Sequence, residues 1–259
     1  MSLQSQDAHY LSSVKNALRI LRSFTMEEPE KKVSDLATSL GLNKSTVSRT
    51  MSTLASEGFV YKNPETNKYR LGFSILTLSG IVNSNMDIYR ESIPVLNKLV
   101  ESTGETSHIS IMDHLDVIYV HKVECNHPVK VLTHVGRRNP LYCTSSGKVL
   151  LAYSKEEHLF ERIIERKLKK FTKNTITNPK HLEEHLNEVK ENGYAYTVEE
   201  YTEGVSSIAA PVYDFQGNVI AAIAIVGPKQ RIQSQKVNSL AKRVISAAND
   251  ISYRMGYWK

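Results

Sequence analysis

Residues 33–71 carry three successive patterns of apolar and polar positions, in the order that a winged helix-turn-helix requires. The first pattern predicts a short helix whose apolar residues share one face: Leu36, Ala37 and Leu40. Ser34 is expected to cap its start, and Gly41 to end it, because glycine adopts a positive φ without strain. Asn43 then stands where it can cap a second helix.

The second helix is predicted over residues 44–57, where one face repeats with helical spacing and would pack on the preceding helix. That face carries Val47, Thr50, Met51, Leu54 and Ala55. The opposite face has short hydrogen-bonding side chains and almost no carboxylates, so it can lie against a polyanion: Ser45, Arg49, Ser52 and Ser56. The alternative is an ordinary helical hairpin with a solvated polar face. That alternative explains neither the order of the elements nor the missing acids.

Gly58 is expected to end the second helix, and two short strands at 59–61 and 69–71 then form a wing around a turn-rich loop. The side chains predicted to contact double-stranded operator DNA are Lys44, Ser45, Thr46, Ser48, Arg49, Ser52, Lys62 and Lys68. We expect Arg49 to make the main base-edge contact. The hydroxyl residues beside it would meet phosphates or neighbouring edges, and the wing lysines would meet the DNA backbone.

A largely apolar helix is predicted over residues 73–85. Its apolar side chains are Phe73, Ile75, Leu76, Leu78, Ile81 and Val82. A helix that is apolar nearly all round needs covering from more than one side. Packing between two domains of one chain would cover it, and so would a dimer contact that places two recognition helices on a palindromic site.

Residues 86–258 predict an α+β domain, in which helices cover one antiparallel sheet. Strands are expected at 108–112, 117–123, 129–132, 194–199, 207–213 and 219–226, and helices at 88–101, 146–153, 156–166, 179–192 and 234–255. The predicted organisation is therefore a DNA-binding domain over 9–72, a linker helix over 73–85 and a second domain over 86–258.

Composition agrees with two domains and with a nucleic-acid partner. The chain has 259 residues, more than most single domains, and 33 Lys and Arg against 27 Asp and Glu. With two cysteines and no basic-apolar-small leader, we expect a reduced, cytoplasmic protein. The longest apolar run, 219–226, has the length of a buried strand and not of a membrane span, and residues 1–9 show no pattern.

Several segments resemble the IclR-type transcriptional regulators along the full chain. The segment 13–21 is similar to the family's first helix and 42–49 to its recognition helix. More specific matches are 136–152 (GRRNPLYCTSSGKVLLA), 203–212 (EGVSSIAAPV) and 221–228 (AAIAIVGP). The resemblance implies a ligand-responsive regulator, more commonly a repressor, that forms a homodimer or a dimer of dimers and has a GAF-like effector domain.

The resemblance also implies a small-molecule effector pocket. When the family's pocket positions are carried over one by one, the pocket would include Val131, Asn139, Leu141, Ser145, Ser146, Val205, Ser207, Ala224 and Val226. Residues 144–147 precede a helix, so their hydroxyls and backbone N–H groups could meet a carboxylate, as on a sugar acid. Plain N-capping by Thr144 or Ser145 is the alternative. Relatives often carry small hydroxyl residues at positions 224 and 226, so a more apolar pocket is expected here.

Catalytic and metal sites find little support in the sequence. Scattered histidines and two cysteines could be combined into a zinc site or a Cys–His pair, and His121 with Cys125 is the most plausible metal pair, but the C-x-x-C spacing is missing. No G-x-S-x-G, P-loop or dinucleotide motif occurs, so we expect no catalytic residue, no cofactor and no enzyme activity. The main rival function is a redox or small-molecule sensor that uses Cys125 or Cys143, with the winged helix serving a protein partner. A purely structural module without a ligand is a third hypothesis.

Overall fold

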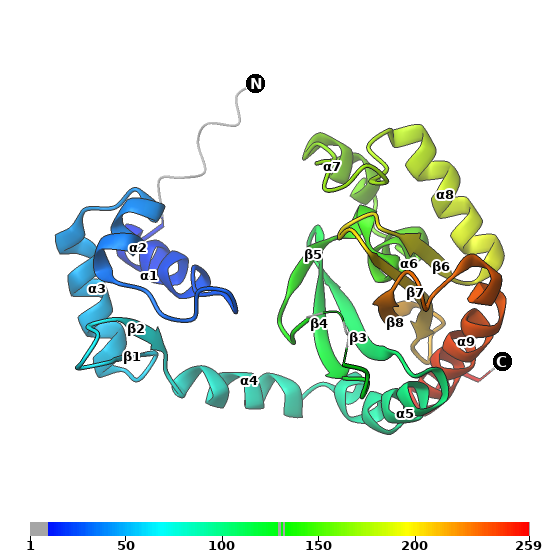
Figure 1. Cartoon of the computed structure of the whole chain (residues 1–259), viewed down its shortest axis with the longest axis horizontal. Coiled ribbons are helices and arrows are strands. Elements are labelled where there is room, and N and C mark those ends of the chain that lie inside the picture. Colours follow the sequence, from blue (N-terminus) through cyan, green and yellow to red (C-terminus); the bar gives the residue numbers. More distant parts are fainter. Residues whose placement is uncertain (1–9, 129–130, 132, 259) are drawn as a thin grey trace. The chain divides into compact units, whose positions relative to one another are not determined.

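The structure is a computed structural model, and it describes residues 10–128, 131 and 133–258 (Figure 1). The chain divides into two compact units, Met1–Asn85 and Met86–Lys259. Residues 1–9, which show no pattern in the sequence, and most of the strand expected over 129–132 lie outside the described residues. Among the described residues, no helix has the length and apolar character needed to cross a bilayer.

The first unit begins with three short helices whose apolar faces meet in one small core. The helices are α1 (Ser12–Arg22), α2 (Val33–Leu40) and α3 (Lys44–Ser56). Side chains from all three and from the wing fill the core: Ile20, Leu36, Val47, Met51, Val60 and Tyr69. Gly41 has a φ of 64°, which lets the chain turn sharply between α2 and α3.

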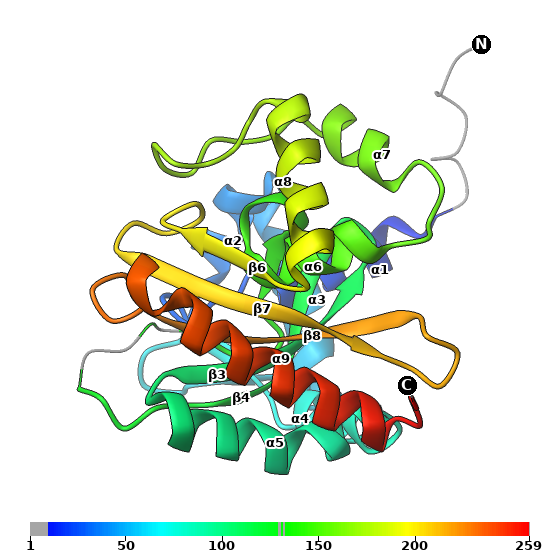
Figure 2. The ribbon, with the colours of Figure 1, turned by 90° about the vertical axis from the view of Figure 1, so that its right-hand side faces the viewer.

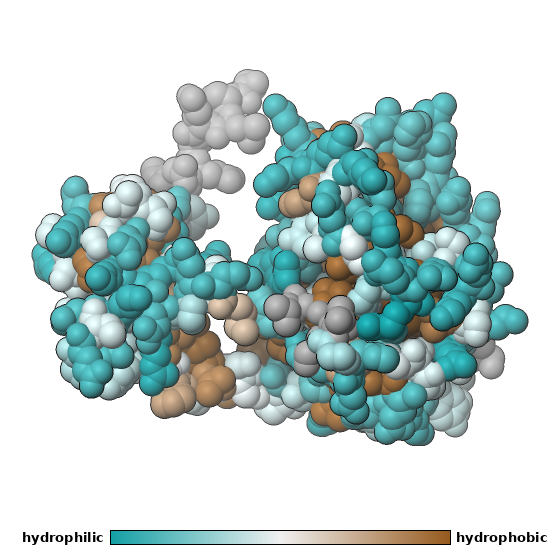
Figure 3. Space-filling model, in the orientation of Figure 1, coloured by the Kyte–Doolittle hydropathy of each residue, from teal (hydrophilic) through white to brown (hydrophobic). Residues whose placement is uncertain are grey.

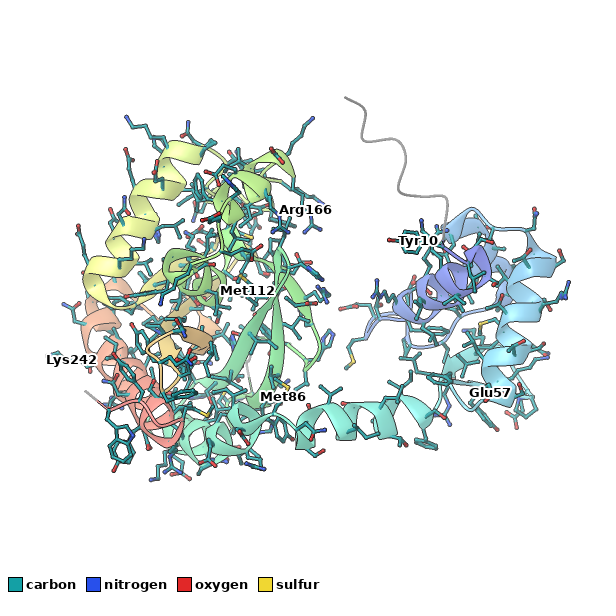
Figure 4. All side chains as sticks on the ribbon, turned by 180° about the vertical axis from the view of Figure 1, so that it is seen from behind. Tyr10, Glu57, Met86, Met112, Arg166 and Lys242 are labelled. Atoms are coloured by element: carbon teal, nitrogen blue, oxygen red, sulfur yellow. The ribbon has the colours of Figure 1, made fainter. Side chains whose placement is uncertain are left out.

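The wing follows α3, whose end is marked by Glu57 in Figure 4. Strands β1 (Val60–Lys62) and β2 (Tyr69–Leu71) pair antiparallel. The predicted N-cap of α2 is wrong: the helix begins after Lys32, and the Ser34 hydroxyl donates to Asp35 Oδ1 at 3.0 Å. Asn43 does occupy the N-cap of α3, although its side chain makes no capping hydrogen bond.

The linker helix α4 (Ser74–Ser84) ends the first unit, and none of its residues is buried. Large apolar side chains are exposed along it and just before it, and they include Phe73 at 73%, Leu76 at 66% and Val82 at 58%. Figure 3 shows apolar surface gathered over this part of the first unit.

The second unit is built on a six-stranded antiparallel sheet, which Figure 1 shows beside its helices. The strands are β3 (Thr106–Asp113), β4 (Asp116–Val123), β5 (Arg138–Pro140), β6 (Ala195–Val198), β7 (Val205–Tyr213) and β8 (Val219–Pro228). Their order in the sheet is β5-β4-β3-β8-β7-β6. Neighbours in space are therefore often distant in sequence, and β3 pairs with β8 through Thr106 opposite Val226.

Helices cover both faces of this sheet. On one face lie α5 (Asp87–Thr103) and α9 (Val237–Arg254), side by side in Figure 2, and on the other lie α6 (Ser145–Tyr153) and α8 (Pro179–Asn192). Side chains alternate accordingly along β8: Ile223 packs toward α5 and α9, whereas Ala224 packs toward α6. Each face has its own apolar core.

The helix boundaries differ from expectation at two places. Helix α7 (Leu159–Glu165) starts three residues later than predicted, because His158 has a φ of 60° and breaks the helical backbone. The C-terminal helix is preceded by a 3₁₀ turn, Ser234–Lys236, before α9 begins. The short edge strand β5 was not predicted as a separate strand, and a 3₁₀ turn, Leu141–Cys143, follows it directly.

The start of α6 lies very close to that turn. A Cβ atom on Gly147 would stand 2.2 Å from the Leu141 carbonyl oxygen and 2.6 Å from its Cα atom. Backbone atoms cannot give way as a side chain can, so only glycine fits at this position. The contact fixes where the first turn of α6 sits on the sheet.

We expect Gly147→Ala to lower the free energy of unfolding by roughly 1–3 kcal/mol, the range seen when a methyl group is forced into a packed core. Gly80→Ala is the matched control, because nothing lies within 4 Å of a Cβ atom built at Gly80. It should be neutral or stabilise by up to about 1 kcal/mol. Urea unfolding followed by circular dichroism measures both, and a Gly147→Ala variant as stable as the parent chain would contradict the contact.

Candidate effector pocket and nucleic-acid interface

Helix α3 presents a sharply divided surface. Val47 and Met51 are fully buried against α1 and α2. All six residues of α3 that the sequence predicts at DNA are exposed: Lys44, Ser45, Thr46, Ser48, Arg49 and Ser52. No acidic residue occurs anywhere in α3, so the exposed face carries no charge that would repel phosphate.

The wing adds cations beside this helix. Lys62 is exposed, whereas Lys68 is half-buried. Lys62 Nζ lies 5.9 Å from the centre of the Tyr69 ring, and the guanidinium of Arg70 lies 4.9 Å from the centre of the Tyr61 ring. Arg70 is exposed on the same ribbon and was missing from the predicted set, although its place in the second wing strand could have flagged it.

The second unit contains a cavity of about 510 Å³ on the α6 face of the sheet. Seven of the nine residues predicted for an effector pocket line it: Val131, Asn139, Ser145, Ser146, Val205, Ser207 and Val226. Further lining residues, which the prediction did not include, come from three strands and from the loops before β5 and after β6: His108, Tyr119, Thr197, Arg137, Glu200 and Tyr201. The cavity has the size of a small-molecule site.

Two predicted residues do not line the cavity. Leu141 and Ala224 are fully buried in the apolar core beneath α6. Leu141 is covered by the close approach of Gly147, and Ala224 lies in the centre of the sheet between its partners His108 and Ala209. We expected alanine at position 224 to make the pocket more apolar. Because Ala224 does not line the cavity, this residue does not change the polarity of the cavity wall.

One part of the wall is the N-terminus of α6. The Thr144 hydroxyl accepts a hydrogen bond from Gly147 N–H at 3.1 Å, so the N-capping interpretation holds for this residue. The first two N–H groups of the helix, those of Ser145 and Ser146, have no carbonyl partner inside the helix and lie at the positive end of its dipole. The Ser145 hydroxyl donates to Ser207 Oγ at 2.8 Å, and Ser207 Oγ lies 2.8 Å from Thr197 Oγ1.

His108 lies in the wall as a neutral imidazole. Its ring is 2% exposed and lies 4.2 Å from the Tyr119 ring, and its Nε2 atom is 3.4 Å from the Ser146 hydroxyl. Burial lowers the pKa of His108 to about 3, and the nearby charge of Lys122 acts in the same direction. At neutral pH this residue therefore contributes a hydrogen-bonding group and no charge.

A buried ion pair joins α6 to the loop after β6. Lys148 Nζ lies 2.6 Å from Glu200 Oε1, with the lysine fully buried and the glutamate 7% exposed. Burial raises the pKa of the Glu200 carboxyl and lowers the pKa of the Lys148 ammonium, since both charges have left water. The single charged residue of α6, next to the apolar run 149–152, was the sequence signal that could have pointed to this pair.

Comparisons with known proteins agree with this architecture. Residues 13–64 match the IclR helix-turn-helix domain, and residues 81–253 match the C-terminal domain of the bacterial transcriptional regulator IclR. The HTH-type transcriptional regulator KdgR of Escherichia coli (strain K12) is 33% identical over 247 residues, which cover 95% of this chain and 94% of that protein. This chain belongs to the IclR family.

Two further relatives of this IclR-family chain bear on its function and fold. The HTH-type transcriptional repressor AllR of Escherichia coli (strain K12) is 29% identical over 244 residues, covering 94% of this chain and 90% of that protein. The solved IclR transcriptional regulator from Alicyclobacillus acidocaldarius has a TM-score of 0.84 at 28% identity and covers 96% of this chain and 100% of that chain. The predicted α+β fold and family are confirmed, and the chain is a DNA-binding transcriptional regulator with an effector-binding domain.

The surroundings of the two cysteines disfavour the rival thiol chemistry. Cys125 and Cys143 are 3% and 1% exposed. Burial raises the pKa of the Cys143 thiol, and the charge of Glu200 raises it further, so the reactive thiolate is disfavoured. The Cys125 sulfur accepts a hydrogen bond from the Thr106 hydroxyl at 3.5 Å. His121 packs edge-on against Tyr89, and the described residues bring together no three His, Cys, Asp or Glu side chains able to hold a metal ion.

The neutral state of His108 predicts a pH dependence of stability. The pKa of His108 is lowered in the folded chain to about 3. Its contribution to the free energy of unfolding is therefore fully present above pH 6.5, the pKa in the unfolded chain, and is lost as the pH falls below 6.5. Between pH 7 and pH 5 this loss should be about 2 kcal/mol. Between pH 7 and pH 5, the free energy of unfolding of the His108→Gln variant should therefore fall by about 2 kcal/mol less than that of the parent chain. Urea unfolding of both chains at both pH values measures the difference. Identical pH dependence in the two chains would show that His108 is not the titrating group.

Proposed function

We propose that this regulator is a repressor that reads a palindromic operator as a homodimer and releases it when an organic acid occupies the pocket. The exposed, acid-free face of α3 is the observation that carries the DNA-reading part. Arg49 lies on this face with Ser45 and Ser52, while the opposite face is buried. Repression agrees with the name of the relative AllR.

Each side chain of this face has a chemical role at a DNA groove. The guanidinium of Arg49 can donate two hydrogen bonds to the O6 and N7 atoms of a guanine, and hydroxyls at 45, 46 and 48 suit phosphates or neighbouring base edges. Lys44 and the wing residues Lys62 and Lys68 supply charge toward the phosphate backbone.

Arg49→Ala should weaken binding to the specific operator by about 1–3 kcal/mol and should relax the sequence preference at the contacted position. Arg90→Ala removes another exposed arginine, from α5, and serves as the control for net charge. Fluorescence anisotropy with operator and random duplexes at fixed salt separates the two effects. Unchanged operator affinity in Arg49→Ala would remove this residue from the reading role.

The apolar surface of α4 supports a homodimer. Leu78, Ile81 and Val82 are 51%, 56% and 58% exposed, and their spacing places them on one helix face. A contiguous exposed apolar face of this kind marks a protein interface. A second copy of the chain would cover it with the same face and would set two α3 helices on two half-sites.

Ile81→Glu should disrupt this dimer, because it places a charge at the centre of the buried apolar contact. Ser79→Glu adds the same charge on the side of α4 that faces away from Ile81 and should leave the dimer intact. Sedimentation equilibrium should give twice the chain mass of 29.2 kDa for the parent chain and for Ser79→Glu, and a lower mass for Ile81→Glu. An unchanged mass for Ile81→Glu would place the interface elsewhere.

The pocket geometry supports an organic acid as effector. The N–H groups of Ser145 and Ser146 at the start of α6 can bind a carboxylate, and the Arg137 side chain lines the same cavity. An acid that binds one arrangement of the dimer better than the other would shift the population toward it and change the spacing of the two α3 helices.

A further inference from the structure

The segment 139–143 separates two cavities of the second unit. The first is the cavity of about 510 Å³ on the α6 face, and the second has a volume of about 250 Å³. Asn139 and Cys143 line the first cavity, whereas Pro140 and Tyr142 line the second. Among the residues that the structure describes, none lines both. The second cavity is therefore a separate site, across β5 and the turn that follows it.

One wall of the second cavity is apolar and includes two aromatic rings. Its residues are Leu115, Pro140, Tyr142, Ile163 and Phe171. The centres of the Tyr142 and Phe171 rings lie 6.4 Å apart, and the Tyr142 hydroxyl donates to the Lys169 carbonyl oxygen at 2.7 Å. On its other side, the Phe171 ring packs edge-on at 4.8 Å against the ring of Tyr201, which lines the first cavity. Both rings are thus held in place and offer fixed apolar surfaces to a ligand.

The remaining wall of the second cavity is cationic. Arg166, Lys167 and Lys169 line it, and no Asp or Glu of the described chain does (Arg166 is labelled in Figure 4). Arg166 Nη1 lies 3.2 Å from Asp116 Oδ1, which anchors one end of the guanidinium. Lys169 Nζ lies 5.2 Å from the centre of the Phe171 ring, and within the described ranges neither lysine has an ion-pair partner. An anion between these three cations would remove their mutual repulsion.

Size and screening restrict the kind of anion that suits this cavity. A cavity of roughly 150 Å³ holds benzene, so one of about 250 Å³ has room for a single ring with one substituent. Arg166 is 62% exposed and both lysines are exposed, so water weakens their attraction for a bare inorganic ion. A ring packed on the apolar wall adds the burial that charge alone does not supply, and it leaves its acid group at the exposed cations.

We infer that the second cavity is a binding site for a small aromatic anion, whose ring packs on Tyr142 and Phe171 and whose carboxylate or phosphate meets the three cations. The inference goes beyond the proposed function, because this site shares no residue with the pocket assigned to the effector. The contact of Phe171 with Tyr201 joins the walls of the two cavities, so a ligand in the second cavity packs on a residue that supports the first.

Photolabelling of the full chain with 4-azidobenzoate locates this site. Mass spectrometry of peptides from the irradiated protein should find label within residues 163–171, which line the second cavity and not the first. Benzoate or phenyl phosphate should suppress that label, and the stronger competitor identifies the acid group. Benzyl alcohol has the ring without the charge, and acetate has the charge without the ring, so each should compete about tenfold or more weakly.

Two double variants with the same change of charge test the cations. In Lys167→Gln with Lys169→Gln, the concentration of 4-azidobenzoate that gives half-maximal labelling of residues 163–171 should rise about tenfold. Lys170→Gln with Lys173→Gln is the matched control, because both lysines are exposed in the same basic run and neither lines the cavity. Its half-maximal concentration should equal that of the parent chain. All four lysines are exposed, and circular dichroism verifies that both variants fold.

Each contrary result has a definite meaning. Absence of label within residues 163–171 overturns the site. Label confined to residues 143–146 or 200–202, which line the first cavity, also overturns it, while supporting an acidic ligand for the effector pocket. Equal half-maximal concentrations in the two double variants would refute the role of the cations. Competition by acetate or benzyl alcohol as strong as that by the aromatic anions would reject the ligand class.

Discussion

The first turn of α6 lies with its backbone directly against the turn Leu141–Cys143, and the arrangement of the pocket depends on this contact. Gly147 permits it, because any larger residue would meet the Leu141 carbonyl. The contact places Ser145 and Ser146, at the start of α6, in the wall of the cavity, and it places Lys148 directly after Gly147, where it reaches Glu200. One steric constraint therefore positions the positive end of the α6 dipole and a buried ion pair together.

The exposed face of α3 and the wall of the pocket differ in how far water screens their polar and charged groups. Helix α3 keeps its polar side chains in water, where each charge is screened and only the summed attraction to a polyanion is large. The pocket removes its groups from water, so a missing partner or an extra charge has a large effect. The exposed Arg90–Asp87 pair illustrates the contrast, since such pairs contribute about 0–1 kcal/mol, whereas breaking a buried pair such as Lys148–Glu200 leaves an uncompensated charge.

This contrast suits a DNA-binding regulator whose second unit holds a cavity of small-molecule size. Screened contacts with a polyanion are individually weak, and a desolvated pocket wall can distinguish similar small molecules by single hydrogen bonds. Within the second unit, the cavity is formed by strands that also carry α5 and α9 on their other face. Occupation of the cavity can thereby bias the packing of that unit, which is what coupling between two sites requires.

The sequence by itself determined the elements whose character is local. The helical repeat around Val47 and Met51 identified α3 and its polar face, and Gly41 identified the turn before it, since both depend only on neighbouring residues. Motif resemblance located most of the pocket but also included Leu141 and Ala224, because a motif does not tell which of its residues are covered. Only the tertiary structure brought His108 and Glu200 to one cavity, since β3 and the loop after β6 are far apart in the chain and the order of strands in the sheet decides what they face.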